Sequence, residues 1–322
     1  METTIGTIPI VRVLFALYPG MDALNVLGPL EVLNKAFHNL NDPCKYSIRV
    51  PFLMHLRVLT YHLIAIVRGL ELRLTRTLTA TPAFECVYAS ATPTVETTQG
   101  VIFKSNASYD DIQKHLAEFD ILIVPGGEHE PVLKDKTQPL QIIRAFSDVQ
   151  QKYPNKERTL MAMGTASLFL AQLGLLAGLS ATTHPDYFAK FEIVCSQAAQ
   201  RDLTERPNVL EERYVVNNLR FDLGNPDENP YIRKKSDARR PSKARKGSNA
   251  WKESNTRRES NARRASMLLG GLRVITTGGT SCGIDAAFYL ISIMVSVDTA
   301  QEVARTLQYN WAKGVVVDGI DI

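Results

Sequence analysis

Short apolar runs that predict β-strands alternate along the chain with segments whose apolar residues recur at helical spacing. The predicted strands cover residues 9–17, 45–50, 101–104, 120–124, 159–163 and 272–277, and helices are predicted over 24–37, 140–151, 283–297 and from residue 167 onward. Several of the strands end in glycine. This alternation predicts an α/β fold with a mostly parallel sheet covered by helices on both faces. Ligands of such folds bind beyond the carboxyl ends of the strands.

The stretch TLMAMGTASLFLAQLGLLAG, residues 159–178, predicts a strand, a sharp turn and a helix in immediate succession. We call the turn at Gly164 the elbow. In α/β enzymes a nucleophile is often held on such a turn at the end of a strand. Here the turn carries glycine, which has no side chain that could attack a substrate.

Composition predicts a soluble globular protein, with 45% hydrophobic and 22% charged residues in a chain of 322. The four cysteines lie far apart without a CxxC pair, and no metal motif or phosphate-binding glycine loop occurs. The N-terminal residues lack the basic start and cleavage site of a signal peptide. We therefore expect no cofactor, no bound metal and no membrane span. The expected location is the cytoplasm, with the nucleus as the alternative.

The basic character of the chain is concentrated in residues 225–267, which hold 13 Lys and Arg against 5 Asp and Glu. The rest of the chain holds 24 Lys and Arg against 28 Asp and Glu, so the net charge of +4 does not indicate a nucleic-acid-binding fold. Few large apolar residues occur in this segment, and we predict a disordered insertion. Ser242, Ser260 and Ser266 each follow a pair of arginines at the spacing that a basophilic kinase recognises, while chance matches in an arginine-rich loop are the alternative.

A second segment, residues 50–86, also interrupts the α/β pattern. It is apolar and basic, and its histidines and arginines interrupt it too often for a membrane span. We interpret it as an atypical insertion outside the core. An appended helix, non-native sequence from an error in the gene model and an interfacial membrane helix are the three alternatives.

Four motifs occur in the order that is typical of one superfamily: LFALYPGMDALNVLGPLEVL, FDILIVPGGEHEPVL, the elbow with AQLGLLAGLSATTHP, and LRVITTGGTSCGIDAAFYL. In these residues the chain resembles the ThiJ/PfpI superfamily of class I glutamine amidotransferase-like proteins, and its isonitrile-hydratase-like branch in particular. The resemblance covers about residues 8–45, 87–212 and 271–319. It implies a single domain over residues 1–322, folded as a flavodoxin-like three-layer α/β/α sandwich. Members of the superfamily often form homodimers.

The resemblance also implies which residues form the site. Members have a cysteine at the elbow, where this chain has Gly164, and an acidic residue near the first helix, where this chain has Asn25. His184, in the TTHP sequence, matches a histidine found near that cysteine. Gly126 and Gly127 match a PGG turn whose backbone N–H groups can face an oxyanion. Both the thiol and its acidic partner are therefore replaced.

Few other side chains near the elbow can replace the missing nucleophile. Thr165 lies next to the elbow, and His184 is the base that its hydroxyl would need. Cys195 and Cys282 are better explained as buried, inert thiols. For His129, which follows the PGG turn, a position facing the pocket and a solvated loop position are both open, and the loop position is favoured.

Three functions remain open on these residues. The first is an isonitrile-hydratase-like or related lyase or hydrolase that works without the thiol, with Asn25, Thr165 and His184 as catalytic residues and Gly126, Gly127 and Gly164 around the substrate. The second is a pseudoenzyme that binds a small molecule or a partner protein. The third, a nucleic-acid binder, is least favoured because the basic segment has little aromatic interleaving for base stacking.

Overall fold

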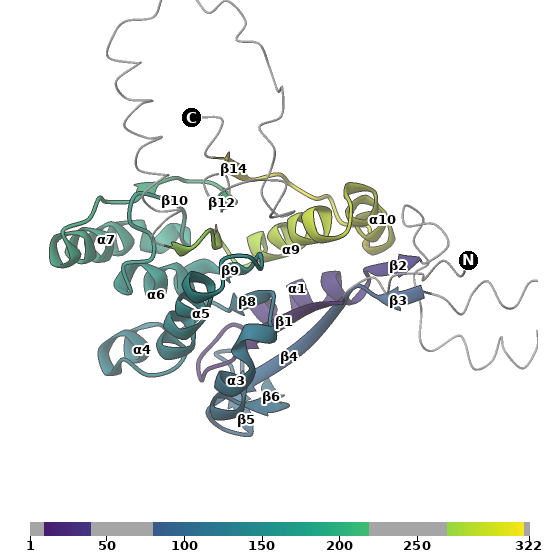
Figure 1. Cartoon of the computed structure of the whole chain (residues 1–322), viewed down its shortest axis with the longest axis horizontal. Helices are drawn as coiled ribbons and strands as arrows, with labels where there is room; N and C mark the ends of the chain where they lie inside the picture. Colours follow the sequence, from purple (N-terminus) through teal and green to yellow (C-terminus); the bar gives the residue numbers. More distant parts are fainter. Residues whose placement is uncertain (1–9, 40–79, 219–268, 319–322) are drawn as a thin grey trace, which may run out of the picture. The chain divides into compact units, whose positions relative to one another are not determined.

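A computed structural model describes residues 10–39, 80–218 and 269–318 of the chain (Figure 1). By their internal contacts the residues fall into two compact units. Among the described residues, the larger unit holds 12–29, 86–218, 269–286 and 312–318, and the smaller holds 10–11, 30–39, 80–85 and 287–311. No helix in the described ranges is both long and apolar enough to cross a bilayer.

The central sheet has eight strands. In spatial order they are β14 (Val315–Asp318), β12 (Tyr214–Asn218), β13 (Arg273–Thr277), β9 (Thr159–Ala162), β8 (Ile121–Val124), β1 (Val11–Ala16), β4 (Phe84–Ser90) and β7 (Ala107–Ser108). The strands β12 and β13 pair antiparallel, whereas β8 pairs parallel with both β1 and β9, and β9 pairs parallel with β13. The order β4-β1-β8-β9-β13 is the flavodoxin-like order 2-1-3-4-5. The predicted α/β fold with a mostly parallel sheet is therefore confirmed.

Strands β8 and β9 are fully buried, which explains why DILIV and TLMA have no polar alternation. The helices of the larger unit include α3 (Tyr109–His115), α4 (Glu130–Asp135), α5 (Leu140–Lys152), α6 (Ser167–Gln172) and α7 (Phe188–Asp202), and α6 packs against α7. The short turns η2 (Leu116–Glu118), η3 (Gly164–Ala166) and η4 (Pro185–Tyr187) precede or follow them. Two small sheets pair β5 (Thr94–Glu96) with β6 (Ile102–Lys104) and β10 (Ser180–Ala181) with β11 (Asn208–Val209).

In the smaller unit, β2 (Phe37–Asn39) pairs antiparallel with β3 (Ala80–Pro82). Helix α10 (Val297–Leu307) begins after Ser296, whose side chain accepts a hydrogen bond from the amide of Thr299. The ring of Phe288 stacks on that of Tyr309 with 5.4 Å between centroids. Two helices contribute residues to both units, namely α1 (Ala23–Asn34) and α9 (Cys282–Met294).

Several predicted boundaries differ from the structure. The first helix ends at Asn34 rather than at residue 37, because the next amides bond three residues back and Phe37 enters β2. Residues 102–104 form β6, which lies in a small side sheet and is not a strand of the central sheet. The predicted insertion 50–86 extends too far, since residues 80–86 lie in β3 and β4 and the side chains of Ala83 and Phe84 are buried. The predicted strand 45–50 and the basic segment 225–267 lie outside the described residues.

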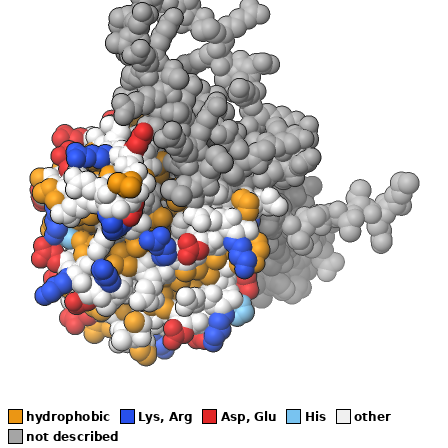
Figure 2. Space-filling model, turned by 60° about the vertical axis from the view of Figure 1, so that its left-hand side comes forward, with side chains coloured by type: hydrophobic (Ala, Val, Ile, Leu, Met, Phe, Trp, Pro, Cys, Tyr) orange, Lys and Arg blue, Asp and Glu red, His pale blue; other side chains and the backbone are white. Residues whose placement is uncertain are grey.

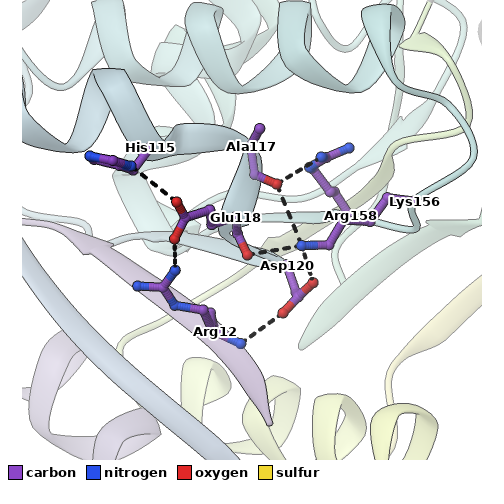
Figure 3. Close-up of polar contacts among 7 residues, drawn as sticks. All are labelled: Arg12, His115, Ala117, Glu118, Asp120, Lys156 and Arg158. Carbon is purple, nitrogen blue, oxygen red and sulfur yellow. Dashed lines mark hydrogen bonds and ion pairs between the residues drawn. The ribbon is translucent and has the colours of Figure 1, made fainter. Parts of the chain in front are cut away.

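A polar network joins the starts of β1 and β8 to the segment before β9 (Figure 3). Asp120 is central to it, because one carboxylate oxygen accepts from the Arg12 amide at 2.8 Å and the other pairs with the Lys156 ammonium at 2.7 Å. The Arg12 guanidinium pairs with Glu118, which also meets His115 at 3.0 Å. These contacts fix the amino-terminal edge of the sheet, at the end of the strands opposite to the elbow.

Candidate functional site

The elbow has the predicted geometry. Strand β9 ends at Ala162, Met163 is extended, and Gly164 has a φ of +53° before the chain turns into α6. A left-handed φ strains residues that carry a side chain, so glycine is the residue that forms this turn most easily. The elbow lies at the carboxyl end of β9, where ligands of this fold class bind.

Three hydroxyl side chains hold the peptide groups of Gly164. Its N–H donates to Thr277 Oγ1 at 3.3 Å, and its carbonyl oxygen accepts from Ser167 Oγ at 2.6 Å and Thr183 Oγ1 at 3.2 Å. Thr183 and Thr277 are fully buried and come from segments far apart in the sequence. The backbone of the elbow is therefore fixed without any contribution from a side chain at position 164.

There is room beside Gly164. A Cβ atom built on this glycine would meet only the Gly278 carbonyl oxygen within 4 Å, at a distance of 3.4 Å. A Cβ built on the neighbouring Gly279 would meet nothing within 4 Å. The position that a side chain would occupy at the elbow is open, although the elbow itself is buried.

The PGG turn lies against the elbow. The Thr165 hydroxyl accepts from the Gly127 N–H at 2.8 Å and donates to the Gly127 carbonyl at 2.8 Å. Gly127 has a φ of +148°, and a Cβ there would overlap the backbone of Gly20 and lie 2.5 Å from the Cα of Met21. The Gly127 amide is thus occupied by Thr165, and the Thr165 hydroxyl is engaged as both donor and acceptor.

Asn25, on α1, brings a polar side chain to the same place. Its side chain is 2% exposed, and a Cβ built on Gly126 would lie 2.9 Å from Asn25 Nδ2 and 3.2 Å from the Thr165 amide nitrogen. Asn25 Oδ1 is buried and makes no hydrogen bond within the described part of the chain. The Met163 carbonyl oxygen would lie 2.6 Å from the same Cβ, and Asn25 Nδ2 donates to Asp22 Oδ2 at 3.4 Å, so two nitrogen donors and a carbonyl acceptor pack against Gly126.

His184 points elsewhere. Its Nδ1 accepts from the Asp186 amide at 3.3 Å, and its ring packs edge-on against Tyr187 at 5.8 Å. Within the described part of the chain, His184 makes no hydrogen bond or ion pair with Thr165 or Asn25. The structure thus brings together Asn25, Gly126, Gly127, Gly164 and Thr165, and leaves His184 one residue beyond the elbow contact made by Thr183.

His129 does not occupy the solvated loop position that its sequence context favours. It is 3% exposed, packs edge-on against Tyr187 at 4.9 Å, and its Nε2 lies 2.9 Å from Lys190 Nζ. Burial and the Lys190 charge lower the pKa of His129, while a hydrogen bond with the Gly127 backbone opposes the shift. The favoured loop assignment was wrong because Tyr187 and Lys190 cover the ring.

The two cysteines near these segments are buried, as predicted. Cys195 is 4% exposed and Cys282 is 7% exposed. Burial raises the pKa of the Cys195 thiol to about 12, and it raises that of Cys282 as well. Thiols with raised pKa values are poor nucleophiles at neutral pH.

The sequence did not single out Ser167, Thr183 or Thr277, which hold the elbow. The signal was available, since Thr-Thr pairs occur at both strand ends beside the elbow, in ATTHP and in ITTGG. In the described ranges, His, Cys, Asp and Glu form no group of three that could hold a metal ion.

Comparison with known proteins gives a family model and a set of similar structures. The DJ-1/PfpI family model matches residues 62–218. Drosophila melanogaster DJ-1beta is 12% identical with a TM-score of 0.48, covering 94% of this chain and 100% of its own. A ThiJ/PfpI family protein from Pseudomonas syringae is 12% identical with a TM-score of 0.48, covering 95% of this chain and 78% of its own.

An AraC family transcriptional regulator from Pseudomonas putida is 12% identical with a TM-score of 0.46, covering 92% of this chain and 99% of its own. No curated protein matches the sequence. The family model extends from within the predicted insertion 50–86 through β12 and includes the PGG turn, the elbow and the TTHP sequence. Together with the flavodoxin-like strand order, this match supports the DJ-1/PfpI family for the chain.

Proposed function

We propose that this protein binds a small molecule at the elbow through a carbonyl or carboxylate oxygen and forms no covalent bond with it. The observation that supports this function is the state of the Thr165 hydroxyl, which both donates to and accepts from Gly127. Gly164 offers no side chain, and the nearby thiols have raised pKa values. A nucleophile paired with a base, which covalent catalysis needs, is therefore missing from the elbow.

The same site is suited to hold an oxygen atom. The space beside Gly164 is open, whereas the place that Asn25 Nδ2 and the Thr165 amide nitrogen share beside Gly126 is also occupied by the Met163 carbonyl oxygen, 2.6 Å from a Cβ built there. The ligand oxygen is therefore proposed to enter beside Gly164, with the Asn25 and Thr165 nitrogens as the nearby donors. N–H groups fixed by the fold stabilise a partly negative oxygen without reorganising when it arrives. The elbow residue of the resembled enzymes would fill the space that the ligand occupies here.

A second function has one observation in its favour. The buried Asn25 Oδ1 makes no hydrogen bond in the described part of the chain, so it can accept one from a water molecule. A water held there could add to an isonitrile, with its oxygen bonding to the terminal carbon and its two hydrogens ending on carbon and nitrogen to give a formamide. This is the isonitrile-hydratase-like activity without a thiol, with Asn25 as the polar group that holds the water.

The binding function is tested by titrating the full chain with acetate, acetamide and an alkyl isonitrile while following amide chemical shifts. We expect saturable shifts for amides near Gly126 and Thr165. Asn25→Leu keeps the approximate volume of the side chain, removes a donor, and should weaken binding by about tenfold. Asn208→Leu, at an exposed position on β11, is the matched control. Absence of saturable shifts with all three probes would contradict the proposal.

A paired reversal separates the two functions. Gly164→Cys with Asn25→Asp restores the residue types that the resembled family has, and formamide production from the isonitrile is measured in it and in the wild type. Turnover by the double variant alone supports a binding protein with an ancestral site. Turnover by the wild type that Asn25→Leu abolishes supports the thiol-free hydratase instead.

We also propose a homodimer, as the resemblance implies, and a cytoplasmic location. Leu24 and Leu27 on α1 are 47% and 46% exposed, and one turn apart they form an apolar pair beside Asn25. Sedimentation of wild type and Leu24→Ser with Leu27→Ser tests this surface. A wild type that stays monomeric at high concentration would rule the dimer out.

A further inference from the structure

The open position beside Gly164 is bordered by a backbone carbonyl group. A Cβ atom built on Gly164 would lie 3.4 Å from the Gly278 carbonyl oxygen and would meet no other atom within 4 Å outside its chain neighbours. No side chain therefore stands between this oxygen and the open position. A ligand atom that enters beside Gly164 comes to the Gly278 oxygen at close to hydrogen-bond distance.

The Gly278 oxygen has no partner within the described part of the chain. Gly278 is buried, and its N–H donates to the Arg213 carbonyl at 2.9 Å, but its own oxygen accepts no hydrogen bond from a described residue. The next carbonyl along the chain, that of Gly279, does accept one, from the Cys282 amide at 2.9 Å. Buried carbonyl groups are nearly always paired with protein, water or a ligand. A group that carries an N–H into the open position would satisfy the Gly278 oxygen.

A backbone donor borders the same position. Thr165 directly follows Gly164, so covalent geometry keeps its amide nitrogen beside the place of the missing side chain. The Thr165 hydroxyl is engaged with Gly127, whereas the Thr165 amide makes no hydrogen bond among the described residues. One unpaired donor and one unpaired acceptor, both fixed by the backbone, therefore meet at one open position.

The charges near this position disfavour an anion. Asp22 Oδ2 accepts from Asn25 Nδ2 at 3.4 Å, and Asp22 Oδ1 accepts from Thr98 Oγ1 at 2.9 Å and Gln99 Nε2 at 3.0 Å. These three partners are neutral, so the Asp22 carboxylate keeps its negative charge close to Asn25, and like charges repel. Figure 2 brings forward the side of α4 and α7, where basic and acidic side chains are interspersed around hydrophobic ones, so this face offers no field of one sign to attract an anion.

We propose that the Gly278 carbonyl selects the ligand of the elbow, which is a neutral molecule with an N–H beside its carbonyl group, such as a primary amide, and not a carboxylate. This inference rests on the binding function proposed above and narrows its ligand class. The ligand oxygen accepts from the Thr165 amide, and the ligand N–H donates to the Gly278 oxygen. A carboxylate would instead place its second oxygen against the Gly278 oxygen, with no hydrogen between the two acceptors.

The test compares three molecules of the same shape, in which a methyl and a carbonyl group are joined to NH₂ in acetamide, to CH₃ in acetone and to O⁻ in acetate. The full chain is titrated with each while backbone amide and carbonyl resonances are followed. Acetamide should bind about fivefold more tightly than acetone, because it alone makes the second hydrogen bond, and acetate should bind most weakly. The Thr165 amide resonance should move with both acetamide and acetone, whereas the Gly278 carbonyl carbon should respond to acetamide alone.

Two variants with the same kind of backbone strain provide the matched comparison. Gly164→Ala places a methyl group in the open position, 3.4 Å from the Gly278 oxygen, and should weaken acetamide binding at least about tenfold. Gly100→Ala is the control, because Gly100 also has a positive φ, of +75°, and its added Cβ would meet nothing within 4 Å. This glycine lies between β5 and β6, and its replacement should leave acetamide binding unchanged.

The inference is overturned if acetone or acetate binds as tightly as acetamide, if the Gly278 carbonyl resonance does not respond to acetamide, or if Gly164→Ala binds acetamide like Gly100→Ala. Equal binding of acetamide and acetone would overturn it while leaving a binding site at the elbow. Absence of any saturable shift, with these molecules and with the isonitrile, would contradict the proposed function as well.

Discussion

The cost of placing a side chain at the elbow follows from the geometry of Gly164. In Gly164→Ala the new Cβ would meet only the Gly278 carbonyl oxygen, at 3.4 Å, so no atom has to move. The φ of +53° costs an alanine about 1–2 kcal/mol. Replacing glycine also restricts the unfolded chain, which returns about 0.4–1 kcal/mol. We therefore expect a net destabilisation of about 1 kcal/mol.

Gly127→Ala is the matched comparison. Its added Cβ would overlap the backbone of Gly20 and lie 2.5 Å from the Cα of Met21, and neither neighbour can rotate away. Overlap with backbone forces larger shifts than overlap with a side chain, and we expect a loss of about 3 kcal/mol or more. The Gly127 contact with Thr165 would be strained as well.

Urea unfolding of the two variants, followed by circular dichroism, measures the difference directly. The midpoint for Gly164→Ala should lie close to that of the wild type, and Gly164→Cys should behave similarly while adding one alkylatable thiol at the elbow. Gly127→Ala should unfold at a much lower urea concentration or fail to fold. If Gly164→Ala is destabilised as strongly as Gly127→Ala, the space beside the elbow is not open and the binding site proposed there is wrong.

Three further predictions concern other parts of the chain. Asp120→Ala removes the acceptors that bind the Arg12 amide and the Lys156 ammonium, and it should destabilise the protein by about 1–2 kcal/mol in urea unfolding. Asp120→Asn keeps one acceptor and should destabilise the protein less. Equal losses of stability in the two variants would contradict the role of the amide contact. Burial lowers the pKa of His129 from its ordinary 6.5, so below that pH the unfolded state binds a proton that the folded state does not. Stability should therefore fall as the pH drops from 7 towards 5. The fall should be less steep in His129→Gln but should not vanish, because burial also lowers the pKa of His38, which is present in both proteins. Parallel pH profiles of the wild type and the variant would refute this. A basophilic kinase should phosphorylate Ser242, Ser260 or Ser266, which mass spectrometry would detect. Phosphomimetic changes at these serines should leave the melting temperature nearly unchanged in thermal unfolding. Absence of phosphorylation would favour chance matches to the motif.

The sequence predicted the sheet well because its strands are buried on both faces. Continuous apolar runs such as those of β8 and β9, each followed by glycine, leave few alternatives to a parallel sheet. The elbow was predictable for the same reason, since Gly164 follows such a run directly. The start of β4 was missed because Ala83 and Phe84 follow an apolar and basic stretch that has no strand periodicity of its own.

The contacts of the site were less predictable than its backbone. That Thr165 bonds to Gly127, 38 positions away, depends on how two strand ends meet in space. The burial of His129 likewise depends on Tyr187 and Lys190 from a later segment. Spacing along a sequence places residues at a sheet edge, while tertiary packing decides which hydroxyl or ring faces which neighbour.

The hydroxyl groups of Ser167, Thr183 and Thr277 hold the Gly164 peptide by its own N–H and carbonyl groups. At this position the backbone atoms hold the turn in place, whereas a reactive group would have to come from the side chain. Lineages can lose or regain the reactive group here without rebuilding the turn. A glycine codon of the form GGU or GGC becomes a cysteine codon by one nucleotide change. Where the Gly164 codon has that form, one nucleotide change would present a thiol on a turn that is already formed.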